Sequence, residues 1–179
     1  MHFKKGAALT EEQVYKRLQV LKKSLDANLR KKARRELLRS DRRVLSDVLT
    51  RVIETADDTE LLAYAAELTV ETRGEEGAAR ILPLLHSSDA LLRRHVCGLL
   101  SNCGGEHSLI ALVDVLENDV SADVRVIAAF ALKKIGDQRA LPALKWAKEH
   151  DDGVDFEGFL VSDEAGEAID AILARNHET

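Results

Sequence analysis

The chain has 179 residues, enough for one ordinary domain with a buried hydrophobic core. Its residues are 45% hydrophobic and 32% charged but only 4% aromatic, with two Pro, and this composition favours helices packed through Leu, Ala and Val over a β-sheet. There is no apolar run of about eighteen residues, and the first residues lack the apolar segment of a signal peptide. We therefore expect a soluble, cytoplasmic protein that does not enter a membrane.

Charge is distributed unevenly along the chain, whose formal net charge is -5. Residues 1–54 hold 15 Lys and Arg against 7 Asp and Glu, so this part carries +8 and the remainder carries -13. Such an asymmetry suggests oriented binding to a partner. A solvated charged face is the commoner explanation.

A repeat of about 32 residues runs along most of the chain. Its clearest copy, residues 119–144, contains an acidic turn, an apolar residue followed by Arg, an Ala-rich helix and a closing Gly. Stepping back from Arg125 by 32, 31 and 32 residues leads to Arg93, Leu62 and Arg30, and each of them follows an apolar residue. The register therefore predicts at least four structural copies.

Continuing the register forward predicts a fifth copy at Glu157, in which Phe156 and Leu160 keep the apolar positions. Apolar residues recur within each copy at three- and four-residue steps, which predicts two helices per copy. No Gly/Ser-rich or Pro-rich linker interrupts the chain, so a single domain over residues 1–179 is expected. The predicted helix pairs are 11–39, 42–72, 76–103, 106–135 and 138–175.

Local signals mark several helix ends. Thr10 and Gln13 have the spacing of a capping box, and Asp41 is a candidate N-cap. Gly136 closes the clearest repeat. Cys97 and Cys103 would lie too far apart on one helix for a disulfide, so we interpret them as small hydrophobic residues.

Residues 119–144 resemble the short HEAT-like repeats of phycobilin lyase subunits and of many bacterial scaffold proteins. The resemblance is carried by Val124-Arg125, Ala128-Ala129, Ala131-Leu132, Ile135-Gly136-Asp137 and Ala140-Leu141-Pro142-Ala143-Leu144. It implies an all-α fold, a right-handed α-solenoid of about five helix pairs, with a curved face left for a partner.

The resemblance also assigns structural roles to the acidic turn residues and to the Arg of the second helix. It implies that Asp89, Arg93, Asp119 and Arg125 are ladder-forming positions of the scaffold. A metal-dependent relative with repeats of this kind, a deoxyhypusine hydroxylase, would place His-Glu pairs at the start of several second helices. In this chain His95 is followed by Val, and His177-Glu178 alone has the dipeptide.

Other signals for chemistry are missing from the sequence. Cys97 and Cys103 lack further ligands at zinc spacing, and Gly104-Gly105 is not followed by the Lys-Ser or Lys-Thr of a phosphate loop. The stretch from Asp151 to Val161 contains two Gly and four acids, which predicts a loop or a distorted start of the last helix. Its first part, Asp151 to Glu157, misses the spacing of a calcium loop, and we expect it to be solvated. We therefore expect no enzyme, no catalytic residue, no metal site and no cofactor.

The leading hypothesis is a non-enzymatic adaptor or scaffold that binds another protein through the surface of its second helices. The candidate contact residues are Arg30, Lys31, Arg34, Arg35, Arg93, His95 and Arg125. An alternative is binding of nucleic acid or phosphate through residues 30–43, where eight of fourteen residues are Lys or Arg, although a solvated outer face explains them as well. A second alternative is an accessory subunit of a bilin-lyase-like enzyme.

The two ends of the chain have opposite charge, because residues 149–174 hold nine acids and no Lys or Arg. Head-to-tail association between copies would use this complementarity, but open contacts of that kind produce filaments, which natural proteins avoid. We expect a monomer or a weak oligomer.

Overall fold

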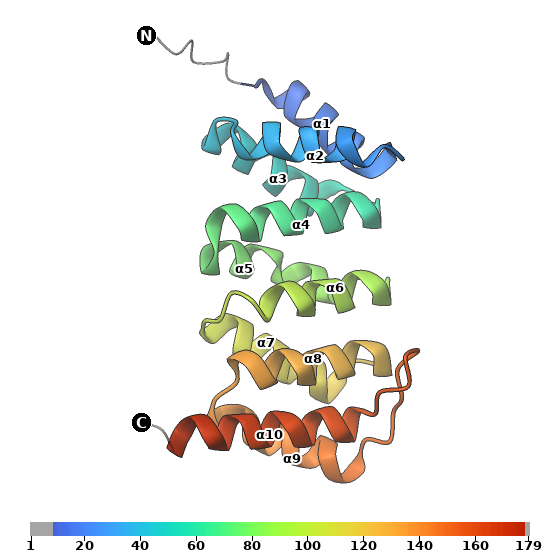
Figure 1. Ribbon diagram of the computed structural model, residues 1–179, viewed down its shortest axis with the longest axis vertical. Helices are drawn as coiled ribbons and strands as arrows, with labels where there is room; N and C mark the ends of the chain where they lie inside the picture. Colours follow the sequence, from blue (N-terminus) through green and yellow to red (C-terminus); the bar gives the residue numbers. More distant parts are fainter. Residues whose placement is uncertain (1–8, 178–179) are drawn as a thin grey trace. The chain divides into compact units, whose positions relative to one another are not determined.

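The computed structural model describes residues 9–177, and ten α-helices lie within this range (Figure 1). Residues 1–8, for which no signal peptide is predicted, lie outside it, as do the side chain of His177 and all of Glu178. The chain divides into two compact units, Met1–Thr72 and Arg73–Thr179. The predicted single domain stays a prediction, and the units are taken in turn.

The first unit contains two helix pairs and one apolar core. The helices are α1 (Glu11–Lys23), α2 (Ala27–Leu38), α3 (Arg42–Thr55) and α4 (Thr59–Arg73), the last of which ends one residue beyond the unit. All four helices contribute to the core through apolar residues at three- and four-residue steps. The core residues are Val14, Leu18, Leu21, Ala33, Leu37, Leu45, Val48, Leu49, Val52, Leu61, Ala65 and Leu68.

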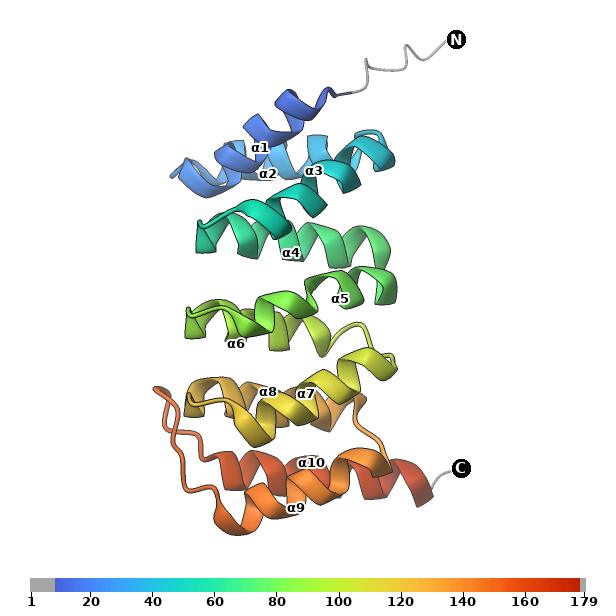
Figure 2. The same ribbon diagram turned by 180° about the vertical axis from the view of Figure 1, so that it is seen from behind.

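The second unit contains three helix pairs in two layers. Helices α6 (Ala90–Leu100), α8 (Ala122–Ile135) and α10 (Val161–His177) lie side by side in one layer (Figure 1). Helices α5 (Glu75–Ile81), α7 (Glu106–Asn118) and α9 (Leu141–His150) form the other layer, which faces the viewer in Figure 2. Short 3-10 helices, η1 (Leu82–His86) and η2 (Gln138–Ala140), extend α5 and precede α9. The predicted all-α solenoid of helix pairs is confirmed.

The predicted helix ends agree with the structure at several positions. Thr10 and Gln13 form a complete capping box, and the Asp41 carboxylate accepts hydrogen bonds from the first backbone N–H groups of α3. Gly136 is the C-cap of α8. The helix predicted through Ile81 to Leu85 continues as the 3-10 helix η1 beyond Ile81, because Pro83 has no N–H for the α-helical hydrogen bond.

The two cysteines are free, and only Cys97 lies on α6, because that helix ends before Cys103. Cys97 is fully buried, and burial raises the pKa of its thiol to about 12. At neutral pH the side chain is therefore a small hydrophobic group, as predicted.

The fifth copy of the repeat does not start where the 32-residue register predicts. Phe156 is 67% exposed and lies in the connection between α9 and α10, and the second helix begins at Val161. Val161 takes the position of Val124, five residues later than predicted, and the small and apolar positions of α8 then recur in α10. The matching residues are Ala165, Gly166, Ala168, Ile169 and Ile172. The register failed because the connection 151–160 contains these five extra residues.

Two buried ion pairs join successive repeats of the second unit. The Arg93 guanidinium donates to both carboxylate oxygens of Asp119 at 2.7 and 2.8 Å, and Arg125 donates to both oxygens of Asp151 at 2.7 and 2.9 Å. The remaining arginine nitrogen donates to a backbone carbonyl six residues earlier, at Ser87 and at Asp119 respectively. The ladder role implied for Arg93, Asp119 and Arg125 is confirmed, whereas Asp89 caps α6.

The first unit keeps half of this arrangement. Arg30 donates to the Ser24 carbonyl, also six residues earlier. The residue 26 positions after Arg30, which would correspond to Asp119 and Asp151, is Ala56. The acid and the second half of the pair are therefore absent at this position of the described chain.

Removing one arginine of the ladder should destabilise the second unit. Arg93→Met leaves the Asp119 carboxylate, whose side chain is 6% exposed, without its cationic partner, and loss of one member of a buried pair costs about 3–5 kcal/mol. Urea unfolding followed by circular dichroism measures the effect. The control is Arg80→Met, which removes a cation from an exposed pair with Glu76 and should cost less than about 1 kcal/mol. Equal losses in the two variants would contradict the ladder's role.

Stability should also fall in acid because of the two aspartates. Burial acts to raise the pKa of Asp119, but hydrogen bonds from Arg93 and Ser121 outweigh it and lower the value, and the hydrogen bond from Arg125 lowers the pKa of Asp151. A lowered native pKa stabilises the fold above the unfolded value of about 3.9, and this contribution is lost as pH falls through the native values. The urea midpoint should therefore drop below about pH 4. Asp119→Asn should reduce both the midpoint at neutral pH and its acid sensitivity.

Candidate functional site

The connection 151–160 folds over the second-helix layer of its own unit. The backbone N–H of Phe156 donates to the Asp123 carboxylate on α8 at 2.8 Å. On α6, the Arg94 guanidinium lies 5.1 Å from the centre of the Phe156 ring and 3.9 Å from the Glu157 carboxylate. The five extra residues thus reach two neighbouring helices.

Asp155 organises the turn of this connection. Its Oδ1 accepts hydrogen bonds from the backbone N–H groups of Glu157 and Phe159, both at 2.9 Å, and its own N–H donates to the Phe159 carbonyl. Gly158 has a φ of +92°, a left-handed conformation that favours glycine. Val161 N–H donates to the Gly153 carbonyl and closes the base of the loop.

Gly153 allows the connection to pass the last ion pair of the ladder. A Cβ atom at this position would lie 2.6 Å from Arg125 Nη2 and 2.9 Å from Asp151 Oδ1. The Gly153 N–H also donates to that same Asp151 oxygen at 3.0 Å. The loop is therefore anchored directly on the Arg125–Asp151 pair.

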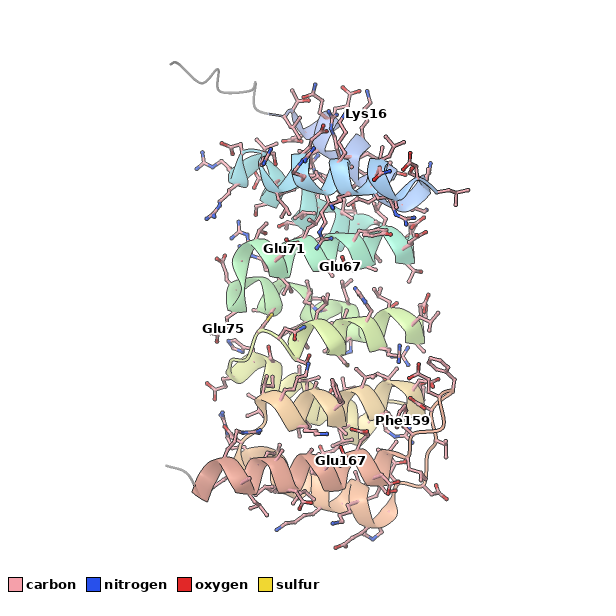
Figure 3. All side chains as sticks on the ribbon, in the orientation of Figure 1. Lys16, Glu67, Glu71, Glu75, Phe159 and Glu167 are labelled. Carbon is pink, nitrogen blue, oxygen red and sulfur yellow. The ribbon has the colours of Figure 1, made fainter. Side chains whose placement is uncertain are left out.

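A pocket of about 250 Å³ lies between α8, the connection and the start of α10. We call it the α8 pocket. Its wall is mostly apolar, and three acidic residues are part of its lining. The lining residues are Val126, Ile127, Phe130, Asp155, Glu157, Phe159 and Glu164. Figure 3 marks Phe159 at the end of the connection and Glu167, which lies on α10.

Two carboxylate oxygens at the α8 pocket are buried without a hydrogen-bond partner, Asp155 Oδ2 and Glu164 Oε2. Asp155 is only 6% exposed, and Glu164 is half-buried. Burial raises the pKa of Glu164, the negative charges of Glu167 and Asp155 act in the same direction, and Lys133 opposes them. Burying a carboxylate oxygen without a partner is unfavourable, so the pocket carries an unsatisfied negative potential.

Aromatic side chains are concentrated at this surface. The chain has four Phe, and three of them lie here: Phe130 is 37% exposed, Phe159 is 51% exposed and Phe156 is 67% exposed. Val154 in the same connection is also exposed. Three of the four phenylalanines of the chain thus lie on α8 and in the connection with their rings partly exposed to solvent.

The expectation that the acidic stretch is solvated was wrong for two of its residues. Asp151 is 8% exposed and pairs with Arg125, and Asp155 is buried in the turn that it organises. Burial becomes possible because hydrogen bonds from arginine or backbone N–H groups compensate the lost hydration of each carboxylate. The remaining acids, such as Asp152 and Glu157, are exposed.

The predicted contact residues of the second unit lie on α6 and α8. Arg93 is 8% exposed and Arg125 is half-buried, and both guanidinium groups bind the aspartates of the ladder. His95 is half-buried on α6. Whether these residues also touch a partner stays a prediction.

The predicted contact residues of the first unit all lie on α2. Arg34 binds Glu67 at 3.0 Å and Glu71 at 2.5 Å, both on α4, where Figure 3 labels them. Arg30 is half-buried, whereas Lys31 and Arg35 are exposed. Lys31 and Arg35 are therefore the members of this group that solvent or a ligand can reach most easily.

The connection 151–160 is the loop that was one of the two predictions for this stretch, but the α8 pocket was not predicted, because the register gave Phe156 and Leu160 apolar positions of the repeat. The available signals were the glycines at 153 and 158 and the return of the α8 pattern at Val161. Among the described residues, no group of three His, Cys, Asp or Glu side chains is placed to hold a metal ion. Within residues 9–177, no helix is both long enough and apolar enough to span a membrane.

Comparisons with known proteins agree with this architecture. The family model described as HEAT repeats matches residues 46–133, and the model of the PBS lyase HEAT-like repeat matches residues 124–150. Among curated proteins, none matches the chain. A solved structure titled as an engineered protein is 21% identical, with a TM-score of 0.51 over 91% of this chain and 80% of that one, a likeness in fold alone.

The two family models cover adjoining parts of the chain and overlap in α8, the helix that contains the clearest copy of the repeat. Arg93, Asp119 and Arg125 of the ladder lie inside the matched residues, as do helices α4 to α9. The chain is a HEAT-like repeat protein.

Proposed function

We propose that the protein is a non-enzymatic adaptor that binds another protein through the surface formed by α8 and the connection 151–160. HEAT repeats generally mediate protein interactions. The observation that carries the proposal is the group of exposed aromatic side chains, Phe130, Phe156 and Phe159, beside a pocket on the second-helix layer.

Exposed phenylalanines are costly to solvate and valuable in an interface. Covering apolar surface contributes about 25 cal/mol per Å², and aromatic residues are enriched at the centres of protein interfaces. The hydrogen bonds of Asp155 and Asp123 fix the connection, so its aromatic side chains are presented on an ordered backbone. A preorganised surface loses less conformational entropy when it binds.

This proposal changes which residues of the second-helix layer would make contact. Arg93 and Arg125 are committed to the ladder, so their main contribution is to hold α6 and α8 in place. His95 remains a candidate contact on α6. A cytoplasmic location and a monomeric or weakly oligomeric state are part of the same proposal.

The exposed phenylalanines should be required for capture of a partner. Affinity capture followed by mass spectrometry with the wild-type chain is expected to recover a protein, and the double variant Phe156→Ser, Phe159→Ser should recover at least about tenfold less. Both positions are exposed, so circular dichroism should show a folded variant.

The matched control is Ile110→Ser, which removes an exposed apolar side chain from α7 in the other layer. This variant should capture the partner as the wild type does. Undiminished recovery by the double variant, or equal loss in the control, would rule out the α8 surface as the interface.

A second candidate function, binding of nucleic acid or phosphate, is favoured by the exposed cations around α2. These residues are Lys31, Lys32, Arg35, Arg39, Arg42 and Arg43. Closely spaced cations of this kind neutralise phosphates and release counterions. An accessory role beside a bilin-lyase-like enzyme is a further alternative, supported by the repeat match at residues 124–150 alone.

The second candidate predicts a strong dependence on salt. Fluorescence anisotropy with a short DNA duplex should show affinity falling by up to about a thousandfold between about 50 and 200 mM salt if six phosphates are contacted. Lys31→Glu with Arg35→Glu should weaken binding, and the control Lys145→Glu with Lys148→Glu on α9 should change it less. Absence of binding at low salt would eliminate this function.

A further inference from the structure

We propose that the α8 pocket binds one cationic side chain, a lysine or an arginine, presented by the partner protein. The inference rests on the proposed adaptor function and specifies the chemistry of its partner. It starts from the two unpartnered oxygens, Asp155 Oδ2 and Glu164 Oε2, which belong to residues that line the same pocket.

Neither Asp155 Oδ2 nor Glu164 Oε2 makes a hydrogen bond that stabilises the connection 151–160. Asp155 organises the turn through Oδ1, which already accepts two backbone hydrogen bonds, and Oδ2 takes no part in that arrangement. Glu164 lies in the first turn of α10, where burial raises its pKa instead of a partner lowering it. Both groups would be stabilised by an incoming donor that carries positive charge.

Nearby charges leave the site negative overall. Glu157 lines the pocket, and Glu167 and Asp163 both raise the pKa of Glu164. The neighbouring cations already have partners: Lys133 binds Glu167, Lys134 lies over the Phe130 ring, and Arg94 contacts Phe156 and Glu157. A cation from outside the chain would therefore meet two carboxylates that no cation of the chain binds directly.

The apolar wall fits the rest of a lysine or arginine side chain. Ile127, Phe130 and Phe159 offer alkyl and ring surface, against which the methylene stem of such a side chain packs while its charge stays polar. Aromatic rings also attract a cation placed over their faces. Pockets for drug-sized ligands measure roughly 300–1,000 Å³. The 250 Å³ of the α8 pocket suits a single side chain better than a cofactor.

Methyl NMR of the full chain tests this inference, with the signal of Ile127 as the probe of the pocket. A short peptide with one central lysine, or one central arginine, should shift this signal with saturation. The same peptide with norleucine or acetyl-lysine at that position should bind at least about tenfold more weakly, because it lacks the charge.

Two substitutions test the carboxylates separately. Glu164→Gln keeps the shape but removes the charge, and Asp155→Asn keeps an acceptor for the two backbone N–H groups while replacing the unpartnered oxygen. Each should weaken peptide binding about tenfold. Asp170→Asn, on an exposed position of α10, removes the same charge outside the pocket and should leave the affinity within about twofold.

Stability separates a binding role from a structural one. Glu164→Gln should keep or raise the urea midpoint, because it removes the charge of a half-buried carboxylate whose Oε2 has no hydrogen-bond partner. A lowered midpoint would assign Glu164 to the fold and overturn the proposal. So would equal binding of the norleucine peptide, or saturable shifts caused by Ca²⁺ alone, which would make the pocket a metal site.

Two further outcomes distinguish this inference from the adaptor function. Concentration-dependent self-association that Glu164→Gln abolishes would assign the pocket to a second copy of the chain and overturn the partner assignment. Capture of a partner that depends on Phe156 and Phe159 but is unchanged by Glu164→Gln would leave the adaptor function intact and refute the cationic pocket. Loss of capture in both variants, with the peptide results above, supports both.

Discussion

Two buried arginine–aspartate pairs determine how the helix pairs of the second unit follow one another. Each guanidinium binds the aspartate that follows the next helix of the other layer. Its third contact is the backbone carbonyl of the residue six positions before the arginine. Because both ends of the arginine are fixed, α6, α8 and the start of the connection 151–160 keep a common register. The exposed surface formed by α8 and the connection is therefore built on fixed helices.

Much of the fold could be predicted because its determinants are local and periodic. The apolar spacing of each helix, the capping box at Thr10 and the cap at Asp41 depend on neighbours within a few residues. The ladder could be anticipated only through the resemblance of Arg125 and its surroundings to a known repeat. Asp151, the partner of Arg125, lies 26 residues further along the chain, and no local pattern in the sequence identifies such a pair.

The α8 pocket could not be predicted from the register for a related physical reason. A fixed repeat length assumes that every connection is equally long, and the five extra residues before Val161 break that assumption. The register therefore gave Phe156 an apolar position of the fifth copy, whereas its side chain is found in solvent, in the loop that the glycines and acids of this stretch indicate. Likewise, a count of acids along the chain does not reveal that one carboxylate oxygen of Asp155 accepts the hydrogen bonds of its turn while the other is buried without a partner.

Gly153 allows the ladder and the connection that lines the α8 pocket to lie in contact, since the absence of a side chain at this position leaves room for the guanidinium of Arg125. A repeat protein can lengthen one connection without repacking the others, because each repeat touches only its neighbours. Here the lengthened connection begins at Asp151, which is held by Arg125, and its backbone is fixed by the hydrogen bond from Gly153 N–H to the same carboxylate. The repeating ladder and the connection particular to this chain thus meet at a single residue, where any side chain larger than hydrogen would displace either the Arg125–Asp151 pair or the loop.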